Sequence, residues 1–328
     1  MKYRNFSDTG WRVSEIGLGC WQIGWCWGDI SDAEARLIVK QALDSGVNFF
    51  DTSDTYGDGR SEKFLSEIAS LHRNENIYIT TKLGRRIRGT GYGRGFKVNA
   101  MEEFIDRSLS NLKTETIDLV QMHCPPLGDC VDDQTYEIMD RLVEKGKIRY
   151  YGISVYNLNE AFAALQRPNI KSIQLVFNIF RQRPRDNLFK LAKDSKVAII
   201  ARGPLASGLL TGEIRLDTVF PENDHRNYNI NGEAFDIGDT FSGIELQKGI
   251  EAVAELRKCL PSNFSLSQLA LKWILSHPEV TTVIPGAVNS QQVIHNSVVS
   301  ELEDISDLDA RVTHIYETYI KADVHHRW

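Results

Sequence analysis

Residues 49–62 read FFDTSDTYGDGRSE and change abruptly from an apolar run to a polar one. Phe49 and Phe50 are typical of the end of a buried strand, whereas the segment from Asp51 to Tyr56 carries two carboxylates and a phenol. Short strands that are apolar almost throughout are expected in parallel sheets covered on both faces. The stretch therefore predicts a buried strand whose carboxyl end presents ionisable side chains.

Strand-like apolar runs of this kind recur eight times along the chain. They lie at residues 16–19, 47–50, 77–81, 117–122, 150–153, 173–177, 197–201 and 282–284. Between them lie segments with helical periodicity, such as the one that opens with the capping box Ser31-x-x-Glu34 and closes at Gly46. Eight alternations of strand and helix predict an α/β fold, a (β/α)8 TIM barrel, as a single domain over residues 1–328.

Three segments exceed what such a barrel requires. Residues 1–15 are expected to form an N-terminal hairpin that turns at Asp8-Thr9-Gly10. Residues 211–243 are polar and rich in Gly, Asn and Asp, which predicts a long functional loop after the seventh strand. The tail at residues 322–328 is a third candidate lid over the C-terminal face of the barrel.

Composition narrows the function classes. The chain has 328 residues and a formal net charge of −6, which argues against a general attraction to nucleic acid or to anionic membranes. No apolar run has the length of a signal peptide or of a membrane span. The five cysteines are odd in number and form no C-x-x-C pair, so free thiols and a cytoplasmic location are expected.

The ends of three consecutive strands carry ionisable residues. Asp51 directly follows the second run, Lys82 the third and His123 the fourth, and Tyr56 comes five residues after Asp51. In (β/α)8 barrels the chemistry lies at the C-terminal ends of the strands. A tyrosine near an ammonium group is expected to have a pKa below its reference value of about 10. Tyr56 is thus a candidate general acid.

These residues, together with further motifs, resemble the aldo-keto reductases in order and over essentially the whole chain. The motifs are DTSDTYGDGRSE (51–62), TTK (80–82), MHCP (122–125), GIS (152–154), QLVFN (174–178), PLASGLLTG (204–212) and IPGAVNSQQVIHN (284–296). The resemblance extends to bacterial-type members and to potassium-channel β-subunits. It implies hydride transfer from NADPH to a carbonyl carbon, with Tyr56 protonating the oxygen. Lys82, paired with Asp51, would lower the pKa of Tyr56, His123 would orient the carbonyl, and no metal would be needed.

The resemblance also implies a cofactor site along the later strand ends. Ser154 and Gln174 match positions that hold the nicotinamide carboxamide, with Asn178 in support, although Val155 stands where many relatives have Asn. Arg202 replaces an aromatic that commonly stacks on the nicotinamide. Its planar guanidinium could stack there too, or could face an anionic substrate.

The remaining cofactor contacts are implied by the last two motifs. Residues matched to the pyrophosphate are Gly203, Pro204, Leu205, Ser207, Gly208 and Leu209, and those matched to the ribose phosphate and adenine are Gly286, Gln292 and Asn296. Relatives usually carry Arg or Lys at or near Val288 or Gln292, and this chain does not. NADPH is therefore expected from the family alone, and NADH stays an open alternative.

The substrate side is indicated by aromatic and basic residues. Trp21, Trp25 and Trp27 follow the first strand and either form a substrate pocket or plug the barrel mouth. Trp27, Asp54 and Tyr56 beside one another could also suit a sugar. Two arginine clusters follow the third and sixth strands, and either are solvated loops or bind an anionic substrate such as a phosphorylated or sulfonated sugar. They comprise Arg85, Arg86, Arg88 and Arg94, and Arg181, Arg183 and Arg185.

The sequence thus predicts an NAD(P)H-dependent reductase of an aldehyde or ketone whose partner is a small-molecule carbonyl compound. Two alternatives stay open. Barrels also carry lysines that form Schiff bases, so Lys82 could instead serve an aldolase or lyase. A cofactor-binding regulatory subunit is the second alternative, because the resemblance includes channel subunits.

Overall fold

A computed structural model describes residues 1–24, 29–71, 76–87, 91–92 and 98–328, and eight parallel strands of these residues form one sheet. In sheet order they are β3 (Leu18–Gly19), β4 (Phe49–Asp51), β5 (Tyr78–Leu83), β8 (Ile117–His123), β9 (Ile148–Ser154), β10 (Ile170–Val176), β11 (Ala198–Arg202) and β12 (Val280–Val283). Parallel bridges join Ile16 to Val283 and Gly19 to Gly286, so the sheet closes on itself. The predicted (β/α)8 barrel is confirmed.

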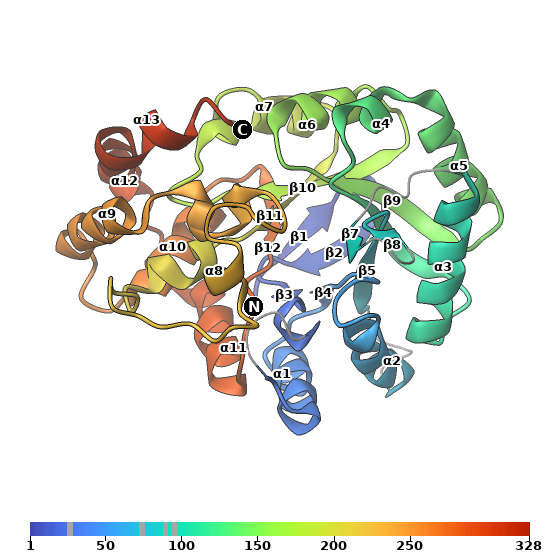
Figure 1. Cartoon of the computed structure of the whole chain (residues 1–328), viewed down its shortest axis with the longest axis horizontal. Coiled ribbons are helices and arrows are strands. Elements are labelled where there is room, and N and C mark those ends of the chain that lie inside the picture. Colours follow the sequence, from blue (N-terminus) through green and yellow to red (C-terminus); the bar gives the residue numbers. More distant parts are fainter. Residues whose placement is uncertain (25–28, 72–75, 88–90, 93–97) are drawn as a thin grey trace.

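Helices surround the barrel, as Figure 1 shows. Those after successive strands are α1 (Asp32–Asp44), α2 (Arg60–Leu71), α3 (Val98–Leu112), α5 (Asp133–Glu144), α6 (Leu158–Leu165), α7 (Leu188–Asp194), α10 (Leu266–Leu275) and α11 (Ser290–Ser297). Shorter or additional ones are α4 (Leu127–Val131), α8 (His225–Tyr228), α9 (Leu246–Lys258), α12 (Asp309–Ile315) and α13 (Lys321–Val324). A small antiparallel pair, β6 (Arg86–Ile87) and β7 (Gly91–Tyr92), follows β5.

Local sequence explains where the first helix begins and ends. The Ser31 side chain accepts a hydrogen bond from the Glu34 backbone N–H at 3.2 Å, as an N-cap does. The buried face of α1 carries Ala35, Ile38, Val39 and Ala42. Gly46, with a φ of 81°, turns the chain into β4. The N-cap and the periodicity that predict this helix are therefore confirmed. The second bond of the predicted capping box is not formed, because Glu34 Oε1 accepts from the Ser290 backbone N–H at 3.1 Å instead.

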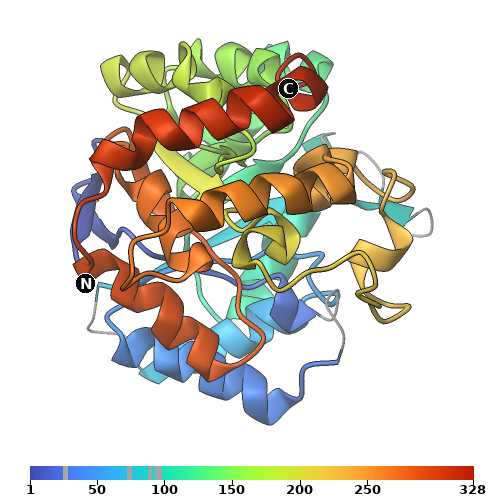
Figure 2. The same ribbon diagram turned by 90° about the vertical axis from the view of Figure 1, so that its left-hand side faces the viewer.

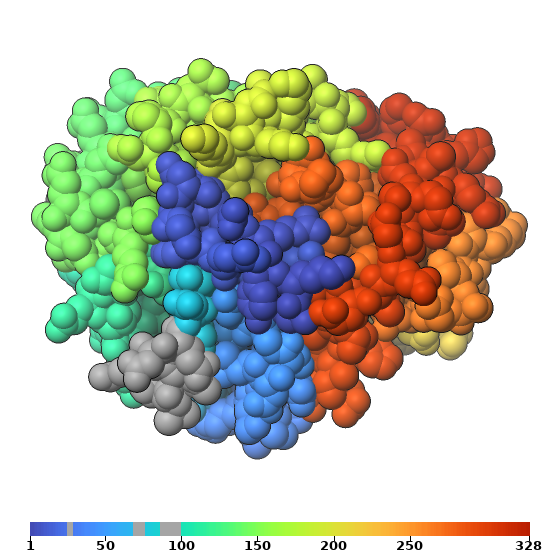
Figure 3. Space-filling view, turned by 180° about the vertical axis from the view of Figure 1, so that it is seen from behind, coloured from blue at the N-terminus to red at the C-terminus, as the bar shows by residue number. Residues whose placement is uncertain are grey.

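The N-terminal hairpin closes one end of the barrel. Strand β1 (Tyr3–Phe6) pairs antiparallel with β2 (Trp11–Ser14). Phe6 and Trp11 are buried in a cluster with Phe49, and the Trp11 ring stacks on Tyr78 with their centroids 4.5 Å apart. Figure 3 shows the hairpin lying across this end. The open end of the barrel is therefore the one that holds the C-terminal ends of the strands.

The long loop after β11 lies at the opposite end from the hairpin, as Figure 2 shows. Trp328, which is 7% exposed, packs against this loop. Its indole Nε1 donates to Asp236 Oδ1 at 3.1 Å, and a Cβ on Gly243 would lie 2.4 Å from its ring. The guanidinium of Arg181 lies 3.6 Å from the ring centroid. The segment after α13 is thus packed into the fold.

The arginine cluster after β10 has a structural role. Arg181 stacks on Trp328, Arg183 donates to the carbonyl oxygen of Trp328, and Arg185 pairs with Asp309 at 2.6 Å. None of the three arginines lies on the wall of the cavity described below. This arrangement does not support the anionic-substrate alternative for Arg181, Arg183 and Arg185.

No helix of the described residues has the length and apolar character that crossing a membrane requires. Cys20, Cys124, Cys130 and Cys259 are free thiols, as expected, and Cys26 lies outside the described residues.

Candidate active site

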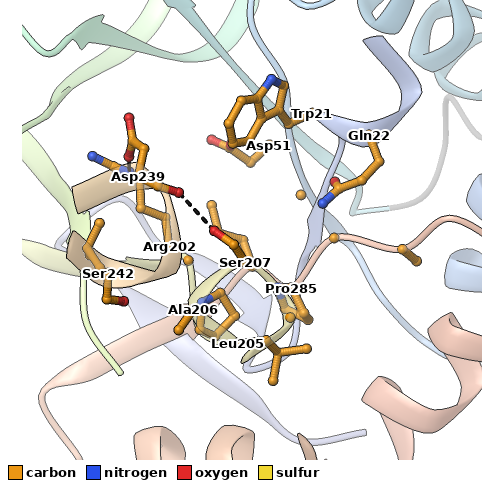
Figure 4. A pocket seen from close by; sticks show the side chains of 18 of the residues that line it. Trp21, Gln22, Asp51, Arg202, Leu205, Ala206, Ser207, Asp239, Ser242 and Pro285 are labelled. Carbon is orange, nitrogen blue, oxygen red and sulfur yellow. Dashed lines mark hydrogen bonds and ion pairs between the residues drawn. The ribbon is translucent and has the colours of Figure 1, made fainter. Parts of the chain in front are cut away.

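A cavity of about 700 Å³ opens at the C-terminal ends of the strands. It carries most of the predicted site residues on its wall, and Figure 4 shows part of it. They are Trp21, Asp51, Tyr56, His123, Ser154, Gln174, Arg202, Gly203, Pro204, Leu205, Ser207, Gly208, Gly286, Gln292 and Asn296. Trp25 and Trp27 lie outside the described residues.

Lys82 lies under this cavity and donates hydrogen bonds to three neighbouring residues. Its Nζ donates to Asp51 Oδ2 at 2.5 Å, to the Thr52 carbonyl oxygen at 2.8 Å and to Tyr56 Oη at 3.2 Å. Lysine has three N–H donors, so these bonds use all of them. Because Tyr56 Oη accepts from the ammonium, its own hydrogen is available for an acceptor in the cavity.

The pKa of Tyr56 differs from the expectation. Burial, and then the negative charge of Asp51, raise the pKa of the phenol well above its usual value. Burial also lowers the pKa of Lys82. The predicted lowering of the Tyr56 pKa is wrong here, because the Asp51 carboxylate offsets the ammonium and burial disfavours a phenolate. Tyr56 is held in its protonated form, which is the form that donates a proton.

Asp51 is held by two glutamines as well as by Lys82. Gln174 Nε2 donates to Asp51 Oδ1 at 2.7 Å, and Gln121 Nε2 donates to the same oxygen at 3.3 Å. Ser154 Oγ in turn donates to Gln174 Oε1 at 3.3 Å. Gln174, expected at the cofactor, thus also fixes the carboxylate. Gln121 is missing from the sequence prediction, although it lies two residues before His123 and so faces the same side of β8.

His123 is a neutral imidazole beside Tyr56. It is 5% exposed, and its Nδ1 lies 3.3 Å from Ser53 Oγ. Burial, and then the positive charges of Arg85, Lys82 and Arg202, hold the pKa of His123 well below its ordinary value of 6.5. The ring centroids of His123 and Tyr56 are 6.1 Å apart. A carbonyl oxygen bound between them could accept a hydrogen bond from each.

An aromatic wall flanks the cavity. Trp21 stacks on Tyr56 with the ring centroids 6.3 Å apart, and it also contacts His225 at 4.9 Å and Phe235 at 5.8 Å. His225 and Phe235 come from the long loop after β11. Trp21 therefore lines the cavity rather than plugging it. The sequence around Trp21 does not indicate that the long loop supplies the two rings packed against it.

Arg202 is paired within the protein. It forms an ion pair with Asp239 of the long loop, and its Nη2 donates to the Val155 carbonyl oxygen at 3.3 Å. Tyr156 Oη donates to the second oxygen of Asp239 at 3.1 Å. Figure 4 shows Arg202 and Asp239 side by side on the cavity wall. Asp239 thus offsets the positive charge of Arg202. Of the two alternatives for Arg202, this arrangement favours stacking on the nicotinamide over binding an anionic substrate.

Arg85 also lines the cavity, with its guanidinium 5.0 Å from the Tyr156 ring centroid. Of its cluster, Arg88 and Arg94 lie outside the described residues, as does the side chain of Arg86. Arg85 therefore belongs to the cavity and not to a solvated loop. Its positive charge lowers the pKa of both Tyr56 and His123.

The backbone after β11 suits the phosphates of a dinucleotide. Gly203, Ala206, Ser207 and Gly208 have φ values of 58°, 47°, 57° and 92°. A left-handed residue beside a right-handed one can turn N–H groups toward an anion. The N–H groups of Ala206 and Gly208, however, donate to the carbonyl oxygens of Gly203 and Leu205 within the loop. Asn178 supports this loop by donating to the Gly203 carbonyl oxygen at 2.8 Å. Leu209 is instead buried against Gly249 of α9 and is absent from the cavity wall.

The far end of the cavity reaches the N-terminus of α11. Gly286, Gln292 and Asn296 lie there, and a Cβ on Gly286 would meet the Gln22 side chain at 2.0 Å. A helix N-terminus favours a phosphate. The Val288 backbone N–H donates to Gln292 Oε1 at 2.9 Å. The extent and donors of the cavity fit a nicotinamide dinucleotide, while Val288 and Gln292 offer no positive charge to a 2′-phosphate.

Comparisons with known proteins agree with this geometry. The profile of the Aldo/keto reductase family matches residues 15–312. The holo structure of an aldo-keto reductase, AKR11C1 from Bacillus halodurans, is 29% identical with a TM-score of 0.79, covering 100% of this chain and 99% of that one. The glycerol dehydrogenase AKR11B4 from Gluconobacter oxydans is 25% identical with a TM-score of 0.77, covering 99% and 96%. A probable voltage-gated potassium channel subunit beta from Oryza sativa is 28% identical over 311 residues, or 90% of each chain.

Proposed function

The chain belongs to the aldo/keto reductase family, and from this premise we propose that it reduces an aldehyde or ketone with NAD(P)H, using Tyr56 as the general acid. The observation that carries the proposal is the hydrogen-bonded order Asp51, Lys82, Tyr56 at the C-terminal rim of the barrel. This order ends in a protonated phenol on the cavity wall. A proton donor in that position is what carbonyl reduction requires.

Each polar residue then has a defined role. When bound, the reduced nicotinamide supplies the hydride to the carbonyl carbon. Tyr56 gives its proton to the carbonyl oxygen, and the hydrogen bond from Lys82 Nζ stabilises the phenolate that is left. Asp51, fixed by Gln174, keeps Lys82 charged. His123 orients the carbonyl through an imidazole N–H, which requires the proton to lie on Nε2 because Nδ1 faces Ser53.

The cofactor residues follow from the wall of the cavity. Ser154, Gln174 and Arg202 would hold the nicotinamide, the segment from Gly203 to Gly208 the pyrophosphate, and Gly286, Gln292 and Asn296 the adenosine end. We propose NADPH as the cofactor on the basis of the family, with NADH as its competitor. A ratio of kcat/KM for the two cofactors measured with one aldehyde decides between them.

The substrate is proposed to be a small polar carbonyl compound, such as a sugar or a sugar derivative. Trp21 and Phe235 provide apolar ring faces, while Tyr56, His123 and Arg85 provide hydrogen-bond donors on the same wall. The similarity to a glycerol dehydrogenase is consistent with a hydroxylated substrate.

The two alternatives make different predictions. A Schiff base would need Lys82 Nζ to reach the substrate, but Nζ is fully engaged and Lys82 is absent from the described cavity wall. Borohydride trapping of a carbonyl compound on Lys82 would nevertheless reveal such an enzyme. A regulatory subunit would bind the cofactor without turning over any carbonyl compound.

The experiment is a panel of aldoses, deoxy sugars, sugar phosphates and simple aldehydes, followed at the nicotinamide absorbance band with NADPH and NADH. For the best substrate, Tyr56→Phe is expected to lower kcat by about 10² or more. Tyr3→Phe is the matched control, because Tyr3 Oη bonds the Gly46 carbonyl oxygen near the opposite end of the barrel. A Tyr56→Phe protein that keeps a near wild-type rate would refute the assignment.

A further inference from the structure

Asp54 is a buried carboxylic acid for which the proposed mechanism has no use. It is 0% exposed although it lies in the loop that carries Tyr56. Its Oδ1 accepts a hydrogen bond from Ser53 Oγ at 3.2 Å, and its Oδ2 has no hydrogen-bond partner within the described part of the chain. A polar atom buried in this way is costly unless it serves a purpose or is neutral.

Ser53 connects this acid to the active site. Its Oγ lies 3.2 Å from Asp54 Oδ1 and 3.3 Å from His123 Nδ1. A serine hydroxyl has one hydrogen, so it can donate to Asp54 or to His123 but not to both. The Thr55 backbone N–H donates to Ser53 Oγ at 3.3 Å, which occupies the second lone pair of the serine oxygen and fits either arrangement.

When Asp54 is protonated, its O–H can donate to Ser53 Oγ. The Ser53 hydroxyl is then free to donate to His123 Nδ1, and this neutral imidazole carries its hydrogen on Nε2. That tautomer donates a hydrogen bond to a carbonyl oxygen in the cavity.

When Asp54 is ionised, the carboxylate accepts the Ser53 hydrogen instead. Ser53 Oγ then accepts a hydrogen bond from His123 Nδ1–H, and Nε2 carries a lone pair. A lone pair on Nε2 repels a carbonyl oxygen, so the imidazole can no longer orient the substrate. Loss of one proton from Asp54 to solvent, followed by exchange of the imidazole hydrogen between Nε2 and Nδ1, balances the change.

We propose that Asp54 and Ser53 are positioning residues that set the tautomer of His123, so that carbonyl reduction requires protonated Asp54. This inference rests on the proposed function for its kinetic consequence, but the state of the imidazole can be measured without turnover. It concerns the side chains of Ser53, Asp54 and His123 alone and does not depend on which carbonyl compound is the natural substrate.

The surroundings of Asp54 place the change near neutral pH. Burial, and then the negative charge of Glu62 on α2, raise the pKa of Asp54 to about 7. Glu62 is fixed by Thr81 Oγ1 at 2.6 Å and by Asn111 Nδ2 at 2.8 Å. Arg107 of α3, which donates to the Asp54 carbonyl oxygen at 3.3 Å, opposes the rise.

Other charged groups face the site from neighbouring strands. The Asp54 backbone N–H donates to the carbonyl oxygen of Lys82, whose ammonium is paired with Asp51. His123 itself faces the positive charges of Arg85, Lys82 and Arg202, which keep it neutral over the range in which Asp54 titrates.

The test compares Asp54→Asn and Ser53→Ala with wild-type protein. The carboxamide of Asp54→Asn can donate to Ser53 Oγ at every pH, as protonated Asp54 does. Wild-type kcat is expected to fall about tenfold for each pH unit above the Asp54 pKa of about 7. In Asp54→Asn this fall should disappear while activity is kept at high pH, which damage to the fold would not produce. Asp44→Asn, an exposed change at the end of α1, should keep the wild-type profile.

The second readout is the ¹⁵N NMR spectrum of His123, assigned by its loss in His123→Gln. The signal should change from the Nε2–H to the Nδ1–H tautomer as the pH rises in wild-type protein, and stay Nε2–H in Asp54→Asn. Ser53→Ala should uncouple the tautomer from pH. One tautomer throughout in wild-type protein, or an unchanged pH profile in Asp54→Asn, would overturn the proposal. If no carbonyl compound is reduced at all, the proposed function fails while the NMR comparison still decides the tautomer.

Discussion

Lys82 Nζ donates a hydrogen bond to Tyr56 Oη at 3.2 Å from a position in which the lysine side chain is only 1% exposed. Lys82 lies on β5 and Tyr56 in the loop after the neighbouring strand β4. Of these two residues, only Tyr56 lines the cavity. The ammonium therefore acts on the substrate through the phenol. This relationship separates the charge that stabilises the phenolate from the group that transfers the proton.

Replacing Lys82 should impair both catalysis and folding. Lys82→Met leaves the Asp51 carboxylate buried without its cation, which typically costs about 3–5 kcal/mol. Activity is expected to fall by about 10² or more, because the phenolate loses its donor. Urea denaturation and initial rates measure the two effects.

A double variant separates these effects. In Lys82→Met combined with Asp51→Asn, much of the lost stability should return while activity stays low. The matched control is Lys171→Met, whose partner Asp8 is half exposed and which should cost at most about 1 kcal/mol. Recovery of activity in the double variant would contradict the role given to Lys82.

The stability of the fold should depend on Asp54 and pH. Because the pKa of Asp54 is raised from 3.8 to about 7 in the folded protein, the stability that the neutral acid provides is complete below about pH 4 and is lost as the pH rises through about 7. Asp54→Asn cannot ionise. Its free energy of unfolding relative to wild type should therefore increase by roughly 2–3 kcal/mol between about pH 5 and pH 8. A difference that is constant with pH would show that Asp54 titrates at its ordinary value.

Trp328 should stabilise the long loop at the site. Its indole packs on the backbone of Gly238 and Gly243 and bonds to Asp236, so Trp328→Ala is expected to cost about 3–5 kcal/mol. The same loop carries Asp239, so KM for the cofactor should rise more than kcat falls. Thermal unfolding and cofactor titration measure these outcomes. An unchanged KM in a clearly destabilised protein would remove the link between Trp328 and the site.

Asp239 should matter more than an exposed aspartate of the same loop. Asp239→Asn leaves the largely buried Arg202 without its counter-charge and weakens the bond from Tyr156. We expect a loss of about 2–4 kcal/mol in stability and weaker cofactor binding. Asp217→Asn is the control, since Asp217 and its partner Arg215 are both exposed. Equal effects of the two changes would show that the Arg202 pair is unimportant.

The sequence was sufficient to predict the repeated strands and helices and the residues that stand at the ends of the strands. Asp51, Lys82 and His123 could be placed on one rim because each ends a strand in a barrel with known polarity. Lys82 and Tyr56 are brought together by the strand order, which the alternation of elements determines. The hairpin could be predicted from its turn, and its role as a barrel plug follows from Phe6 and Trp11.

Other features depend on packing that no local pattern encodes. Asp239, Phe235 and Trp328 reach the site or support it only because the long loop and the end of the chain fold back over the barrel. The direction of the Tyr56 pKa shift was predicted incorrectly because burial and the negative charge of Asp51 outweigh the nearby positive charges. Asp54 lies within residues 49–62, but its pKa is raised by burial and then by the negative charge of Glu62 on α2, neither of which the local sequence indicates.

The central claim is direct hydride transfer to a carbonyl carbon with Tyr56 supplying the proton. It is tested by reducing the best substrate with a cofactor deuterated on the transferring position of the nicotinamide and analysing the product by mass spectrometry. The account predicts one deuterium on the former carbonyl carbon with wild-type and Tyr3→Phe protein, and product formation slowed by about 10² or more with Tyr56→Phe. Product without deuterium, or equal rates for Tyr56→Phe and wild type, would contradict it.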